Sequence, residues 1–284
     1  MLKIEVLDGE VRVVQDGKGL VDSMPLTSGA EQFAAVIEAM KRANPGFDGA
    51  MIPGLENGRL VSLDFKTGNV TDISPLRELK HLRMLQMVGS FEPDKGISDL
   101  SPLKGLPLTE LHISSNLRVT DLSPLKGMAL QKLNAMGCRV TDFTSLAGMP
   151  LRELWAWYWA GSDLSPLKGM PLTQLNIGGN GREMDLTPLA GAPLEFICLN
   201  SSNVSDLSPL KGMPLRVLLS ENTLVSDLSP IRDAKLIEFA GDSSRISNIS
   251  VLQGMPITNF HCDVLGQREL ELLRGCNSLK SINF

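Results

Sequence analysis

The sequence predicts an α/β solenoid in which a short strand and a single helical turn alternate along the chain. Two observations support this fold class. A pentapeptide first seen as Asp72-Ile-Ser-Pro-Leu76 occurs nine times with variations, at spacings of 21 to 27 residues. Within each repeat, apolar and polar residues alternate over a few positions, which is typical of a strand with one buried face. A fixed period of this length indicates stacked units that share one long core.

The composition is that of a globular protein, with 43% hydrophobic and 21% charged residues. A chain of 284 residues often divides into two domains, but a solenoid grows in one dimension without needing a second core. The formal net charge of -5 argues against binding to a phosphate backbone, which needs clustered Lys and Arg. We therefore expect one solenoid and no nucleic-acid partner.

A single repeat illustrates the expected unit. Leu111 and Ile113 alternate with polar residues and predict a short strand. Asn116 follows where the chain must turn inward, and its amide can satisfy backbone groups of neighbouring coils. Ser123-Pro124 then predicts a helix N-cap followed by proline at the first helical position, and Gly127 closes the turn. Each unit is thus a strand, a corner and one helical turn on the outer side.

These residues resemble the leucine-rich repeat pattern L-x-x-L-x-L-x-x-N/C-x-L, and the Asp-Leu-Ser-Pro-Leu variant is similar to internalin-like arrays. The resemblance covers residues 60–284. Eleven predicted strand starts follow one another at Leu60, Leu82, Leu108, Leu130, Leu151, Leu172, Leu194, Leu215, Leu236, Ile257 and Leu279. The resemblance implies a curved solenoid with a parallel β-sheet on the concave face and short helical turns on the convex face. It also implies that the concave face binds a partner.

A narrower resemblance rests on residues 41–49 and 70–76. These segments look like the repeat regions of planctomycete-type bacterial proteins, which are often attached to Ser/Thr kinases. Neither the Gly-rich loop nor the catalytic motifs of a kinase occur in this sequence. The resemblance implies a regulatory role by analogy alone.

Residues 1–59 are predicted to form an N-terminal cap, because an open stack must cover the apolar end of its core. Alternating residues around Asp8-Gly9 predict a β-hairpin. Ser28 and Glu31 form a capping box, and the helix that it begins ends at residues 44–46, Asn-Pro-Gly. The apolar stripe of this helix, expected to be buried, is Phe33, Val36, Ile37 and Met40.

The solenoid itself is assigned to residues 60–263, and residues 264–284 are predicted to close it with a helix and a last strand. The helix is expected over Gln267–Arg274, where the repeated pentapeptide is replaced by better helix formers. The sequence stops on the strand without a polar cap. This ending favours either a longer natural chain or self-association at that end.

Strand positions between the buried ones are predicted to face solvent on the concave side, about 5 Å apart from repeat to repeat. The middle column is Asp64, Gln86, His112, Asn134, Trp155, Asn176, Cys198, Leu219, Ala240 and His261. The third column is Lys66, Val88, Ser114, Met136, Trp157, Gly178, Asn200, Glu221, Asp242 and Asp263.

All three tryptophans and the only tyrosine lie in the segment Trp155-Ala-Trp-Tyr-Trp159. Exposed aromatic side chains are enriched at protein interfaces, so this break in the polar pattern predicts a binding surface. The predicted partner-binding residues are Trp155, Trp157, Met136, Phe196 and Leu219. The alternative is that these rings pack on one another. Trp159 falls at the inward corner, where we expect it to fill the core space left by Gly161.

The sequence predicts no catalytic residue, no cofactor and no metal site. Its four cysteines lack zinc-ligand spacing, and the repeated aspartates are interpreted as turn caps and not as a calcium ladder. His112 lies seven strands from His261, so the two cannot share a site. His261 and Asp263 are interpreted as a surface pair, and Cys198 has no neighbouring base.

The predicted function is therefore that of a non-enzymatic module that recognises a protein or peptide on its concave face. Two alternatives remain: a structural unit that self-associates through the solenoid ends, and carbohydrate binding through exposed tryptophan. No signal peptide and no transmembrane segment are visible, so we expect a cytoplasmic protein without membrane contact, unless the chain was excised from a longer one.

Overall fold

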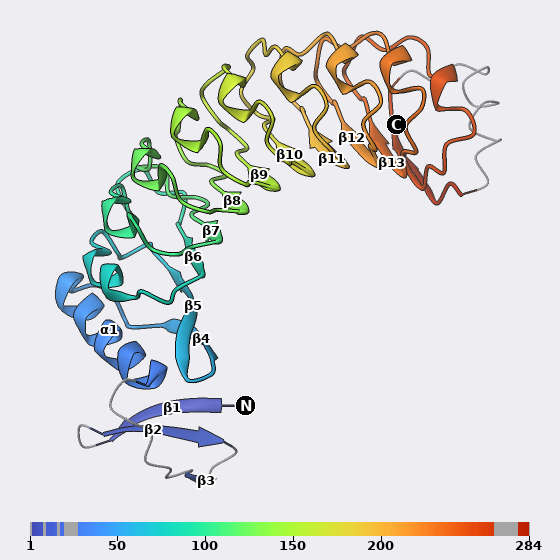
Figure 1. Cartoon of the computed structure of the whole chain (residues 1–284). Coiled ribbons are helices and arrows are strands. Elements are labelled where there is room, and N and C mark those ends of the chain that lie inside the picture. Colours follow the sequence, from blue (N-terminus) through green and yellow to red (C-terminus); the bar gives the residue numbers. More distant parts are fainter. Residues whose placement is uncertain (1, 8–9, 16–17, 20–27, 264–277, 284) are drawn as a thin grey trace.

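The computed structural model describes residues 2–7, 10–15, 18–19, 28–263 and 278–283. From residue 28 onward they form an arc-shaped solenoid with strands along the inner side and helical turns along the outer side (Figure 1). The large sheet has 12 strands in the described part of the chain, in the order β15 to β4. The predicted leucine-rich repeat architecture, with its parallel sheet on the concave face, is confirmed.

The sheet begins with an antiparallel pair, β4 (Met51–Glu56) and β5 (Arg59–Lys66), and every later strand pairs in parallel with the strand before it. The later strands are β6 (Met84–Val88), β7 (Glu110–His112), β8 (Lys132–Asn134), β9 (Glu153–Trp155), β10 (Gln174–Asn176), β11 (Phe196–Cys198), β12 (Val217–Leu219), β13 (Glu238–Ala240), β14 (Asn259–His261) and β15 (Ser281–Asn283). The registers pair Leu111 with Leu133 and Leu133 with Leu154. A continuous row of buried apolar side chains, mostly leucines, therefore forms the core-facing side of the sheet.

The outer turns are short 3-10 helices, one in each repeat. They are η1 (Ser74–Glu78), η2 (Ser101–Leu103), η3 (Ser123–Leu125), η4 (Thr144–Leu146), η5 (Ser165–Leu167), η6 (Thr187–Leu189), η7 (Ser208–Leu210), η8 (Ser229–Ile231) and η9 (Ser250–Leu252). The prediction that Ser123 is the N-cap is wrong, because Ser123 is the first residue of η3. The carboxylate of Asp121 caps the turn: it accepts hydrogen bonds from the Ser123 backbone N–H and hydroxyl, both at 2.7 Å. Gly127 closes the turn with φ +76°, as its backbone freedom allows.

The inner corners are held by buried polar side chains, as predicted for Asn116. Its amide donates to the carbonyl oxygens of Met87 at 2.8 Å and Ile113 at 3.0 Å, and its Oδ1 accepts from the Thr67 hydroxyl at 2.6 Å. Since Met87 lies on β6 and Thr67 directly follows β5, Asn116 joins its own coil to the two coils before it. In later repeats the Ser202 and Thr223 hydroxyls occupy this corner and donate to carbonyls of their own coil.

The amino-terminal segment contains an antiparallel sheet of β1 (Leu2–Leu7), β2 (Glu10–Gln15) and β3 (Lys18–Gly19). The turn predicted at Asp8-Gly9 lies outside the described residues, although the strands on both sides of it pair as a hairpin. The predicted helix is α1 (Gly29–Ala43), and the Ser28 hydroxyl accepts from the Glu31 N–H at 3.4 Å. Phe33, Val36 and Met40 are buried, whereas Ile37 is only half-buried.

Asn44 ends α1 and ties it to the first repeat. Its amide donates to the carbonyl oxygens of Met40 and Asp72, and its Oδ1 accepts from the N–H groups of Thr71 and Asp72. The helix is thereby fixed against the start of the solenoid core. At the other end, β15 is present as expected, while the helix predicted over residues 267–274 lies outside the described residues.

Candidate partner-binding surface

The aromatic side chains of the concave face are partly packed on one another, so the structure combines the two interpretations that the sequence left open. Trp155 ends β9 and Phe196 begins β11, with β10 between them. Their ring centroids nevertheless lie 5.2 Å apart with a 31° angle between the ring planes. The two rings therefore meet across the intervening strand. Both side chains are half-buried, which leaves part of each ring open to a partner.

Trp157 lies two residues after Trp155 and rests on the neighbouring repeat. A Cβ atom added at Gly178 would lie 2.6 Å from the Trp157 ring, and one at Gly179 would lie 2.8 Å from its Nε1. The two glycines therefore form the seat of the indole. Trp157 is half-buried there, with one flank against Tyr158 at a centroid distance of 5.8 Å and an interplanar angle of 79°.

Tyr158 also belongs to this surface, although it is not among the binding residues predicted from the sequence. Its side chain is 59% exposed and its backbone has φ +67°, a left-handed conformation that costs about 1–2 kcal/mol for a residue with a Cβ atom. The preceding and following repeats place Gly137 and Gly179 at this position, also with positive φ. The signal for Tyr158 was thus a large aromatic where flanking repeats have glycine. The left-handed conformation belongs to the repeat, since Ser115, Ser201, Asn222 and Ser243 adopt it at the same position.

Of the other predicted binding residues, Met136 and Leu219 are half-buried and lie on either side of the aromatic group. The prediction that the whole middle column faces solvent is wrong. Asn176, Cys198 and Ala240 are only 7%, 2% and 4% exposed. Small side chains between larger neighbours on strands about 5 Å apart lie below the surface that those neighbours form. Burial raises the pKa of the Cys198 thiol to about 11, so this cysteine stays protonated and is no nucleophile at neutral pH.

Trp159 is confirmed as a core residue. It is fully buried and stacks on Phe143 with ring centroids 4.2 Å apart and an interplanar angle of 13°. A Cβ atom at Gly161 would lie 2.4 Å from the Trp159 ring, so the glycine provides the space that the indole fills.

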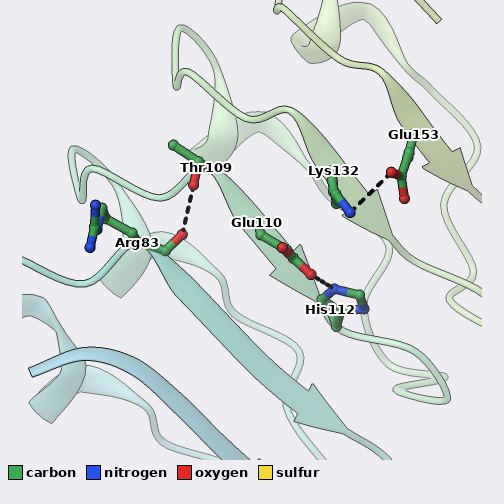
Figure 2. A network of polar contacts seen from close by, with 6 residues as sticks. All are labelled: Arg83, Thr109, Glu110, His112, Lys132 and Glu153. Carbon is green, nitrogen blue, oxygen red and sulfur yellow. Dashed lines mark hydrogen bonds and ion pairs between the residues drawn. The ribbon is translucent and has the colours of Figure 1, made fainter. Parts of the chain in front are cut away.

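Charged side chains on β7 to β9 pair with one another (Figure 2). The His112 ring lies 2.6 Å from the Glu110 carboxylate, and the Lys132 ammonium lies 3.0 Å from the Glu153 carboxylate. The hydrogen bond and charge of Glu153 raise the pKa of Lys132. Glu153 lies two residues before Trp155, so a ligand on the tryptophans would also meet this polar border.

On the opposite side of the aromatic group, Glu221, Asp242 and His261 converge on the concave face. One potential ligand atom from each residue lies within 4.8 Å of the others. The pKa of Asp242 is raised, first by burial and then by the nearby Asp263 charge, while His261 and a hydrogen bond with Glu221 oppose the rise. From the sequence, His261 was predicted to pair with Asp263 alone. The missed signal was three successive carboxylates in the third column of strand positions.

No protein-family model matches the chain, and no curated protein matches it. Solved structures of the same fold do. Internalin InlF from Listeria monocytogenes has a TM-score of 0.68 at 20% identity, over 92% of this chain and 85% of that chain. Internalin C2 from the same species has a TM-score of 0.52 at 21% identity, over 93% and 99% of the two chains. A plant ice-binding protein has a TM-score of 0.65 at 14% identity, over 89% and 95%.

At these identities the likeness shows the fold, which is the leucine-rich repeat solenoid. Within the described ranges, no helix has the length and apolar character needed to cross a membrane.

Proposed function

We propose that the chain is a non-enzymatic binding module that recognises a protein or peptide on its concave face. The observation that carries this proposal is the group of four half-buried or exposed aromatic side chains, Trp155, Trp157, Tyr158 and Phe196. Aromatic residues that are held rigidly and only partly buried supply large contact area at a low entropy cost.

The arrangement also suggests what the ligand looks like. Apolar side chains at the centre of the ligand would pack against the rings, with Met136 and Leu219 at the margins of the aromatic surface. Polar groups of the ligand would meet the paired side chains Glu110 with His112 and Glu153 with Lys132 on one side. We therefore expect a peptide with an apolar centre and a polar flank.

The test is a peptide-display selection against the immobilised chain, followed by affinity measurements on the enriched peptides. The double variant Trp155→Ala, Trp157→Ala should bind at least about thirtyfold more weakly, since truncating a central aromatic costs about 2 kcal/mol or more. Lys168→Ala, an exposed residue on the convex face, is the matched control and should leave affinity unchanged. Enriched peptides that bind the double variant as tightly as the unmodified chain would refute the proposal.

The double variant retains one tryptophan whose fluorescence reports on folding. The chain contains three tryptophans, so Trp159 is the one that remains, stacked on Phe143 in the core. Its fluorescence should stay that of a buried indole. A shift toward the emission of exposed tryptophan would show that the variant is misfolded, and the single variants would then be compared instead.

Self-association is the competing proposal, and one observation favours it. Strand β4 forms an edge of the large sheet and carries two exposed apolar side chains, Ile52 and Leu55. Exposed apolar edge strands are templates for pairing with another chain. Light scattering over a hundredfold range of concentration tests self-association. A constant monomer mass argues against self-association, and dimers that Ile52→Lys abolishes support it.

Carbohydrate binding through the tryptophans is the other alternative. It predicts hits on a glycan array that the double variant loses.

A further inference from the structure

The group formed by Glu221, Asp242 and His261 has the arrangement of a metal site. The three residues come from three adjacent strands: Glu221 follows β12, Asp242 follows β13 and His261 ends β14. Backbone pairing fixes their relative positions, since Ala240 is in register with His261 and the Asn222 N–H donates to the Asp242 carbonyl at 2.7 Å. The ligand atoms already lie within 4.8 Å of one another. Only small side-chain adjustments would bring all three onto one ion.

Negative charge is concentrated at this point. Asp263 lies on the next strand in the same column, so three carboxylates stand on neighbouring strands. Among the described residues, no Lys or Arg forms an ion pair with any of them. The Oδ1 atom of Asp242 is buried and has no hydrogen-bond partner in the described part of the chain. A buried carboxylate oxygen without a partner is costly, and a bound cation removes that cost.

The residues around the group orient the ligands. The Asn200 amide donates a hydrogen bond to the Glu221 carboxylate, and the Asn200 Oδ1 accepts from the Glu221 N–H at 2.9 Å. The Asp263 carboxylate accepts from the Ser243 N–H, which holds it beside Asp242. Such outer contacts are typical of metal sites, where they fix the direction of each ligand.

We propose that Glu221, Asp242 and His261 bind one divalent transition-metal ion, with Zn²⁺ as the best match. One imidazole nitrogen and two carboxylate oxygens belong to the ligand set of zinc. Mg²⁺ and Ca²⁺ prefer all-oxygen surroundings, so the imidazole disfavours them. Three protein ligands leave a coordination position open to water on the concave face. The ion would join β12, β13 and β14, and this role is independent of the aromatic surface.

The first test uses the histidines of the unmodified chain. The sequence contains three, His81, His112 and His261, so each imidazole can be followed separately by NMR. Addition of ZnCl2 should shift the His261 signals and saturate at one equivalent, while the signals of His81 stay in place. MgCl2 at the same concentration should shift none of them. A His261 signal that does not respond to Zn²⁺, or that responds equally to Mg²⁺, would overturn the proposal.

The second test is calorimetric titration of ZnCl2 into variants. Asp242→Asn and His261→Gln should each weaken binding at least tenfold, because even outer-shell changes typically cost 10- to 100-fold. His112→Gln is the matched control, since His112 also contacts a carboxylate on the concave face but has one such partner in Glu110. It should leave binding unchanged. Equal affinity in all variants, or equal loss in the control, would contradict the assignment. If circular dichroism shows Asp242→Asn to be unfolded, Glu221→Gln makes the same comparison.

Discussion

Gly178→Ala tests whether the seat of Trp157 is as tight as the structure shows. The added Cβ atom would lie 2.6 Å from the Asn200 carbonyl oxygen and 2.6 Å from the Trp157 ring. The first distance is about 0.7 Å shorter than an ordinary C···O contact, and the second is about 0.9 Å shorter than an ordinary C···C contact. The Trp157 ring can tilt away from the alanine. The Asn200 carbonyl oxygen accepts a hydrogen bond from the Gly179 N–H at 2.7 Å, so it cannot move as easily.

The expected net effect is a loss of stability. Overpacking of this kind costs about 1–3 kcal/mol. Replacing glycine by alanine also restricts the unfolded chain, which stabilises the fold by about 0.4–1 kcal/mol. The clash is the larger effect, so we expect the free energy of unfolding to fall by about 1–2 kcal/mol.

The assay is urea denaturation followed by circular dichroism, with Gly46→Ala as control. At Gly46 the nearest atom to an added Cβ is 3.6 Å away, an ordinary contact, so that variant should keep or slightly gain stability. Indole N–H signals in NMR should show Trp157 displaced and Trp159 unmoved. A Gly178→Ala variant as stable as the unmodified chain, with an unshifted Trp157 signal, would refute the described packing.

Three further predictions concern the corner, the turns and the exposed tyrosine. Asn116→Ala should lower the free energy of unfolding by about 2 kcal/mol or more, since it leaves the buried Met87 carbonyl without its donor. Urea denaturation measures this change. The control variant Asn203→Ala, at an exposed asparagine, should have little effect. Acid should destabilise the turns below about pH 4, because the turn hydrogen bonds lower the pKa of the capping aspartates in the folded state. The stability that these aspartates contribute is present at neutral pH and disappears as the pH falls through that lowered pKa. A urea midpoint that does not fall from about pH 5 to about pH 3 would contradict this. The capping aspartates with a lowered pKa are Asp142, Asp185 and Asp227. Tyr158→Gly should leave the free energy of unfolding unchanged or higher, because it relieves left-handed strain, but it should weaken peptide binding. A lower free energy of unfolding with unchanged peptide affinity would show that the Tyr158 ring is structural.

The repeat architecture could be predicted because its causes are local. Alternation around Leu111 and Ile113 specifies a strand, and the small hydrogen-bonding residue at Asn116 specifies the corner. Trp159 could be placed in the core because Gly161 occupies a slot where other repeats have valine. Each of these signals can be read from the residues of one repeat aligned with the other repeats.

Features that depend on neighbouring repeats were predicted less well. The burial of Cys198 and Asn176 follows from the size of side chains on adjacent strands, which a single strand does not reveal. The same holds for Glu221 with Asp242, whose approach needs the register between strands. Strand β4 was also not predicted, although its signal is local. The Asn57-Gly58 turn that joins it to β5 is a strong hairpin signal in the sequence itself.

The contact of Trp155 with Phe196 has a consequence for cooperativity. In a repeat protein each unit ordinarily touches only the units next to it, and stability is a sum of single-unit and nearest-neighbour terms. Here side chains from β9 and β11 touch across β10, which adds a coupling between second neighbours. The three central coils should therefore open as one unit, so that hydrogen exchange is slower and more uniform there than in the coils on either side.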